Sequence, residues 1–116
     1  MNTTEKRITS KIIRELALFL MFHKINDFTI TTRINEEKTE LITKTKRLDD
    51  KTIAFIKARL EQGRKLEIET YGWELVGDLD SESELEIVGS LIDGLTIEHD
   101  ETSTTLVLTR KNRYRR

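Results

Sequence analysis

The feature that most constrains the fold is an apolar pattern in the C-terminal third of the chain that changes its period at a glycine. Over residues 83–92 the apolar residues recur at helix spacing, and Gly94 then interrupts the pattern. Over residues 95–110 apolar and polar residues alternate on both sides of a polar turn at 100–103. This predicts a short amphipathic helix followed by a two-stranded hairpin. Gly89 lies on the apolar face of that helix, where a missing side chain lets another backbone approach. The residues expected to be buried on this face are Leu85, Val88 and Ile92.

Length and composition limit the class of protein. A chain of 116 residues corresponds to one domain and can bury a core without the support of disulfides or bound metal. Cysteine is absent, which excludes disulfides, thiolate metal sites and a catalytic thiol. The chain start lacks the pattern of a signal peptide, and no apolar run is long enough to cross a bilayer. The formal net charge of -1 gives no overall attraction to nucleic acid or anionic lipid. We therefore expect a cytoplasmic protein without membrane contact.

The N-terminal half of the sequence predicts a helix, two strands and a second helix. A wide apolar stripe predicts a helix from Thr3 or Thr4 to about Lys24. Residues 28–34 alternate as a strand, and residues 39–48 are expected to pair back with them. In this second strand Ile42 and Leu48 fall on the same face, and the positions between them on that face are lysines. That strand is therefore expected to be less buried or nearer an edge of the sheet.

The middle of the chain continues with helices. Asp49 or Asp50 is expected to cap a helix that runs to about Gln62. Residues 65–76 fit a helix or a pair of strands, and the helix is favoured; residues 81–84 have the form of a capping box. The resulting order predicts an α+β two-layer sandwich, with a mixed or antiparallel sheet and helices on one face. We assign residues 1–110 to a single α+β domain and 111–116 to a basic C-terminal tail.

Three stretches together suggest a family. Glu15 and Leu16 lie on the helix before the first strand, Asp49 and Asp50 follow the second strand, and Leu-Glu-Ile-Val begins at residue 85 of the last helix. In this order the chain resembles the histidine-kinase-type ATPase fold, of which the anti-sigma kinases are a short form. The resemblance implies that Glu15 falls on the family's catalytic glutamate. It also implies that Asp49 or Asp50 falls on the aspartate that holds adenine.

The resemblance also shows what this chain lacks. The family's magnesium-binding asparagine falls on Phe19, and a phenylalanine cannot ligate a hard cation. Lys51 and Thr52 stand where the family has glycines beside the base, and Glu82 and Glu84 stand where it has glycines beside the triphosphate. The two glutamates would repel the phosphates of a nucleotide. Repulsion between like charges about 4 Å apart costs on the order of 4 kcal/mol at an effective dielectric constant near 20. The sequence therefore predicts a domain that has lost nucleotide binding and carries no cofactor.

Other residues with chemical potential have simpler interpretations. His23 lies late in a helix and His99 in a strand, and two separate histidines without cysteine do not predict a metal site. The acidic residues at 78–84 lack the spacing and the glycine of a calcium loop. Asp49 and Asp50 fit a helix cap. No phosphate-binding loop, nucleophile elbow or zinc-protease motif is present.

We predict a regulatory, non-catalytic domain, a pseudo-ATPase that binds a protein partner or itself. The first helix has more apolar surface than one sheet face can cover, which predicts an exposed contact region. The residues assigned to this interaction are Phe19, Phe22, Tyr71 and Trp73, although Trp73 also fits a core anchor. One alternative is a weak ATP-binding anti-sigma-type serine kinase that uses Glu15 as base. A second is nucleic-acid binding through the basic tail, which the absence of any other basic patch disfavours.

Overall fold

The computed structural model describes residues 3–64 and 85–112. Seven elements occur in them. The helices are α1 (Thr3–Phe22), α2 (Asp50–Leu60) and α4 (Leu85–Gly89), and the strands are β1 (Phe28–Ile34), β2 (Lys38–Lys46), β3 (Gly94–His99) and β4 (Ser103–Lys111). The predicted helix at 65–76, the capping box at 81–84, Tyr71, Trp73, Glu82, Glu84 and the end of the tail at 113–116 lie outside the described residues.

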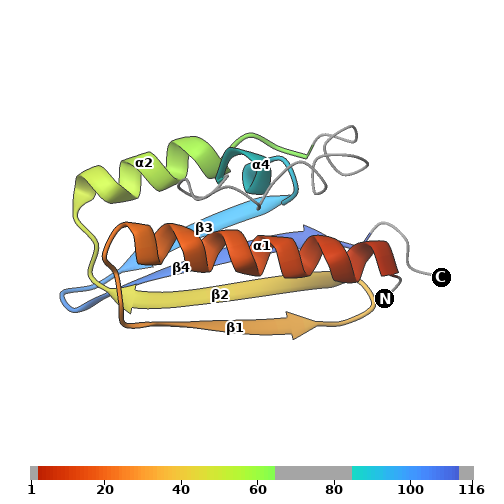
Figure 1. Cartoon of the computed structure of the whole chain (residues 1–116), viewed down its shortest axis with the longest axis horizontal. Helices are drawn as coiled ribbons and strands as arrows, with labels where there is room; N and C mark the ends of the chain where they lie inside the picture. Colours follow the sequence, from red (N-terminus) through yellow and green to blue (C-terminus); the bar gives the residue numbers. More distant parts are fainter. Residues whose placement is uncertain (1–2, 65–84, 113–116) are drawn as a thin grey trace.

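The described part of the chain is an α+β fold with three helices and one four-stranded sheet. The strand order is β1-β2-β4-β3, and every neighbouring pair is antiparallel. The helices lie on one face of the sheet, with α1 running along the strands and α2 and α4 beside it (Figure 1). This confirms the predicted α+β class and the antiparallel form of the sheet.

The position and the facing of β2 differ from the expectation. β2 is a central strand, because β4 returns beside it and pairs with it over residues 38–46. The side chains of β2 that face the helices are Leu41 and the residues two positions before it and two and four positions after it. Ile42 lies on the opposite face. The expectation that this strand is less buried or lies nearer an edge was therefore wrong, as was the parity taken from Ile42. Threonines fill the remaining inward positions of β2, and because threonine suits either face, hydropathy did not reveal the parity.

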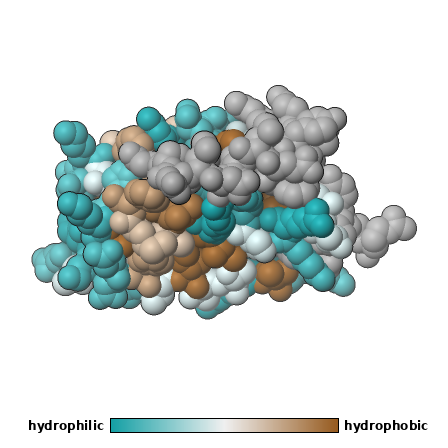
Figure 2. All heavy atoms as spheres, in the orientation of Figure 1, coloured by the Kyte–Doolittle hydropathy of each residue, from teal (hydrophilic) through white to brown (hydrophobic). Residues whose placement is uncertain are grey.

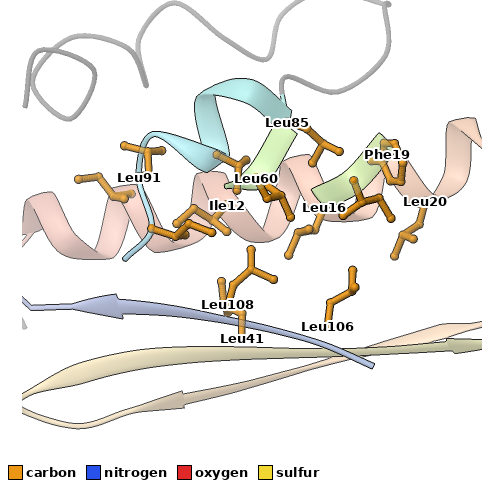
Figure 3. Close-up of a cluster of buried hydrophobic side chains, with 14 of the residues drawn as sticks. Ile12, Leu16, Phe19, Leu20, Leu41, Leu60, Leu85, Leu91, Leu106 and Leu108 are labelled. Carbon is orange, nitrogen blue, oxygen red and sulfur yellow. The ribbon is translucent and has the colours of Figure 1, made fainter. Parts of the chain in front are cut away.

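The core lies between the sheet and the helices. Leu41, Leu106 and Leu108 point from the sheet toward Ile12 and Leu16 of α1 (Figure 3). On the helix side the core continues into α2, into α4 and into the residues just after α4 through a further set of buried side chains: Ile56, Leu60, Leu85, Val88 and Leu91. Burial of one such side chain contributes about 1.5–3 kcal/mol. The helix face predicted from Leu85, Val88 and Ile92 is thus buried as expected, although the regular helix ends at Gly89.

α1 ends in a compact turn that aims the chain into β1. The N–H of Ile25 donates to the carbonyl of Leu20 at 2.8 Å, and the N–H of Lys24 donates to that of Met21 at 3.0 Å. These two bonds form a Schellman motif, and Lys24 takes the left-handed conformation with φ 62°. Ile25 then packs against the core beside Leu20. The end of the helix is therefore fixed by backbone hydrogen bonds rather than by the polar residues that follow it.

Gly89 allows the close backbone approach that the sequence predicted, and the backbone that approaches it belongs to α2. A Cβ placed on Gly89 would meet the backbone oxygen of Arg59 and would lie 3.0 Å from Cα of Leu60. Real Cβ atoms essentially never approach backbone atoms that closely, so a side chain at this position would force the two helices apart. The absence of a side chain at Gly89 thus sets the distance between α2 and α4.

A buried ion pair joins the N-terminal turn of α1 to β4. Nε of Arg110 donates to Oε1 of Glu5 at 2.9 Å, and Nη2 donates to Oε2 at 2.8 Å. Nη1 donates to the carbonyl of Leu91 at 2.7 Å. Arg110 therefore belongs to the core, although a basic run begins at it in the sequence. β4 also takes in Lys111, the first residue assigned to the tail, and the N–H of Asn112 after it donates to the carbonyl of Glu37 at 2.9 Å.

Candidate functional site

The sequence-predicted site residues that the structure describes belong to α1 and to the start of α2. Glu15, Phe19 and Phe22 lie in the second half of α1, and Asp49 and Asp50 stand at the start of α2. Among the described residues, a hollow of about 190 Å³ is lined there by His23, Lys51, Thr52 and Phe55. Cofactor and ligand pockets are typically about 300–1,000 Å³, so this hollow is small for a nucleotide.

Glu15 is enclosed within the protein. Its side chain is 1 % exposed, and Oε2 lies 3.1 Å from Nη1 of Arg14. A general base must come within hydrogen-bond reach of the proton that it removes. A carboxylate that is enclosed and paired in this way is held as a structural group, so this arrangement gives no support to a catalytic role for Glu15.

Asp49 is the N-cap of α2, as the sequence predicted. Its Oδ1 accepts a hydrogen bond from the backbone N–H of Thr52 at 2.7 Å. This bond to the Thr52 amide lowers the pKa of Asp49 below its ordinary value. Lys51 and Thr52 form the first turn of the helix, at the positions where the resemblance places glycines. Asp50 is the first residue of the helix and is exposed. The two aspartates therefore fit a helix start.

Aromatic rings pack together between the end of α1 and the middle of α2. The ring of Phe19 stacks on that of Phe55 with centroids 5.9 Å apart, and the His23 ring lies 4.2 Å from Phe19. Nδ1 of His23 is 3.1 Å from the carbonyl oxygen of Phe19. The guanidinium of Arg59 lies over the ring of Phe55, 3.9 Å from its centroid. Phe19 is 2 % exposed, so it is part of the core and is not itself a contact for a partner. Phe55 and Arg59 were not foreseen as part of this cluster.

The outer side of the α1 end carries exposed apolar side chains. Met21 is 51 % exposed and Phe22 is 49 % exposed, and Leu18 beside them is half-buried. Residues three and four apart are neighbours on a helix surface, so Leu18 joins the other two into one patch, here called the α1-end patch. Figure 2 shows hydrophobic side chains gathered on the side of the molecule where α1 ends. The excess apolar surface expected on this helix is therefore present at Met21 and Phe22.

The described residues offer no site for other chemistry that the sequence suggested. No group of three histidine, aspartate or glutamate side chains is placed to hold a metal ion within residues 3–64 and 85–112. His99 lies in β3, the strand farthest from the one that follows His23. No helix among these residues is long and apolar enough to cross a membrane.

Comparison of the chain with protein-family models, with characterised proteins and with solved structures finds no match. The likeness to the histidine-kinase-type ATPases therefore stays a prediction from the sequence. The class that the fold itself defines is an α+β domain with a four-stranded antiparallel sheet covered by helices on one face.

Proposed function

We propose that this protein is a non-catalytic, regulatory interaction domain that binds a protein partner through the α1-end patch. The observation that carries the proposal is the exposure of two large apolar residues, Met21 and Phe22, at the end of a helix whose other large apolar side chains are buried or half-buried. Neighbouring exposed apolar side chains are typical of contact surfaces, whereas single ones occur on every protein. In the same part of α1, Phe19 is buried and stacks on Phe55 of α2, which fixes the end of α1 against α2.

We further propose that the domain derives from the histidine-kinase-type ATPase fold and has lost nucleotide binding. Three features support this. The position of the family's magnesium ligand is Phe19, which is buried in an aromatic cluster. Asp49 is engaged as a helix cap, and Glu15 is enclosed. These residues do not fit a bound Mg-nucleotide, so no step of nucleotide chemistry is assigned to them.

Calorimetry with Mg-ATP tests the loss of nucleotide binding. We expect no heat of binding with the purified full chain, because the buried Phe19 stands at the family's magnesium position and Asp49 is engaged as a helix cap. Micromolar affinity would overturn the pseudo-ATPase proposal and favour the serine-kinase alternative.

Proximity labelling in the native cell tests the interaction surface. The wild-type chain is compared with Met21→Ser/Phe22→Ser, and Thr96→Ser on the exposed side of β3 serves as the matched control. Because both patch residues are about half exposed, the double variant should keep its fold, which circular dichroism verifies. We expect at least one protein to be labelled by the wild type and the control but not by the patch variant. Identical labelling by all three chains would refute a role for the patch.

A further inference from the structure

Among residues 3–64 and 85–112, β1 is an edge strand with few of the features that normally prevent pairing. It ends one side of the sheet, and all its side chains from Thr31 to Ile34 are exposed. Its register with β2 is unbroken over seven residues, so no bulge twists the edge away. It has no proline and no lysine, and Arg33 is its single charge. Natural proteins normally protect an edge by one or more of these means, and an unprotected edge is a template for another strand.

The opposite edge of the sheet is different in character. β3 has six residues and carries Glu98, and it lies between Asp93 and Asp100. Two copies of this strand would bring acidic side chains together, which opposes pairing. The contrast between the two edges favours β1 as the site of association.

The hydrogen bonds of the β1–β2 hairpin fix which backbone groups of β1 point outward. The N–H of Asn35 donates to the carbonyl of Lys38 at 3.0 Å. Asn35 and Lys38 are therefore a hydrogen-bonded pair. Because hydrogen-bonded and non-hydrogen-bonded pairs alternate along an antiparallel ladder, every second residue before Asn35 also bonds to β2, namely Arg33, Thr31 and Thr29. The residues that direct their N–H and C=O groups away from the sheet are therefore Phe28, Ile30, Thr32 and Ile34.

We propose that β1 pairs antiparallel with β1 of a second copy of this chain, about a twofold axis at Thr31. In this register Phe28 faces Ile34 of the second copy, and Ile30 faces its Thr32. Every outward N–H and C=O of these residues then finds a partner, because each facing pair is of the hydrogen-bonded type. The two four-stranded sheets become one continuous sheet with both helix layers on the same face.

The side chains of β1 suit this register. Ile34 is 50 % exposed in the single chain, and the ring of Phe28 from the second copy would cover it. Aromatic and β-branched residues that face each other are favourable cross-strand pairs. Arg33 faces Thr29 of the second copy, so the two arginines do not meet. The proposal is independent of the α1-end patch, because it depends on the backbone of β1 and not on Met21 or Phe22.

A single cysteine tests the axis. Thr31 is exposed and the chain has no cysteine of its own, so Thr31→Cys introduces a unique thiol. Non-hydrogen-bonded antiparallel partners have Cα atoms about 4.5 Å apart, which lies within the range of a disulfide. Under mild oxidation we expect Thr31→Cys to form a covalent dimer in nearly full yield. The controls Thr29→Cys on the same strand and Thr96→Cys on β3 should stay largely uncrosslinked. Equal yields from all three variants would overturn the proposed register.

Charge variants at the same position test association without crosslinking. Sedimentation equilibrium of the wild type from micromolar to millimolar concentration should give a species of twice the 13.6 kDa chain mass. Thr31→Lys places two like charges on the axis and should weaken the dimer about tenfold, as should Thr31→Asp, while an equimolar mixture of the two should restore it. Met21→Ser/Phe22→Ser should leave the dimer unchanged. The dimer proposal would be refuted if the wild type stays monomeric at millimolar concentration, or if Thr31→Lys dimerises as the wild type does. Either result would leave the proposal for the α1-end patch unaffected.

Discussion

The ion pair between Glu5 and Arg110 should be the most sensitive polar contact of the described core. Both side chains are almost fully buried, at 1 % and 2 % exposure, and they are joined by two hydrogen bonds of 2.9 and 2.8 Å. Glu5→Ala leaves the guanidinium buried, with its bond to the carbonyl of Leu91 kept and the carboxylate removed. Loss of one partner of a buried pair typically costs about 3–5 kcal/mol. Because Glu5 lies in the first turn of α1, fraying of that turn can admit water, so we expect about 3 kcal/mol.

Urea unfolding followed by far-ultraviolet circular dichroism measures this loss. A domain of this size loses roughly 3–6 °C in Tm per kcal/mol, so Glu5→Ala should also lower Tm by roughly 10–15 °C. Glu98→Ala is the matched control, since it removes an exposed glutamate and should change the free energy of unfolding by less than about 0.5 kcal/mol. A loss below about 1 kcal/mol for Glu5→Ala would refute the reasoning, because the buried arginine would then have found solvent or another partner at little cost.

The double variant separates the loss of the pair from the loss of packing. Replacement of a whole buried pair by apolar residues of similar size is often neutral or stabilising. In Glu5→Leu/Arg110→Met the carbonyl of Leu91 also loses its donor, which costs about 1–3 kcal/mol. We therefore expect the double variant to be no less stable than Glu5→Ala. Additive losses from the two sites would show that Glu5 and Arg110 are not coupled.

Three further predictions concern the backbone and pH. Gly89→Ala should destabilise the fold by about 1–3 kcal/mol, because its Cβ overlaps the backbone of α2, whereas Gly94→Ala meets open space and should be nearly neutral in the same urea titration. Lys24→Gly should raise the free energy of unfolding by about 1 kcal/mol, since Lys24 holds a left-handed conformation that glycine adopts freely; an unchanged or lower Tm would contradict this. The pKa of Asp100 is lowered chiefly by the hydrogen bond from the Thr102 amide. The Asp100 carboxylate therefore stabilises the turn at pH values above its ordinary pKa of 3.8, and this stabilisation is lost as the pH falls through the lowered pKa. The stability deficit of Asp100→Ala at neutral pH should therefore shrink in acid titrations below pH 3.8, and a deficit that is constant with pH would contradict this origin.

Local patterns in the sequence predicted those parts of the fold that depend on neighbouring residues. The helix over the first residues, the strand at 28–34 and the Asp49 cap follow from periodicity and capping chemistry. The missing side chain of Gly89 on an apolar face indicated a close approach, although not which helix would supply the backbone. The excess of apolar surface on α1 indicated exposed residues at its end, but helical spacing alone did not separate Phe19 from Phe22.

The site was less predictable, because its parts come from distant segments. Phe19 is buried only because Phe55 of α2 stacks on it, and no local pattern pairs these two residues. Glu15 carries a resemblance in the sequence, yet the packing around α1 encloses its carboxylate. The edge at β1 also emerged only from the strand order, since a hairpin by itself has two free edges.

For the seven elements that the structure describes, the sequence by itself determined their types, their order and most of their limits, because these depend on hydrophobic period, caps and turn residues within a few positions of each other. Tertiary structure alone decided that β2 is central, that Ile42 faces away from the helices, and that Arg110 lies in the core. Each of these depends on a contact between residues far apart in the chain, most clearly the pair of Glu5 and Arg110 across 105 positions. Such a contact leaves no periodic trace in either segment, so it exists only once the chain has folded.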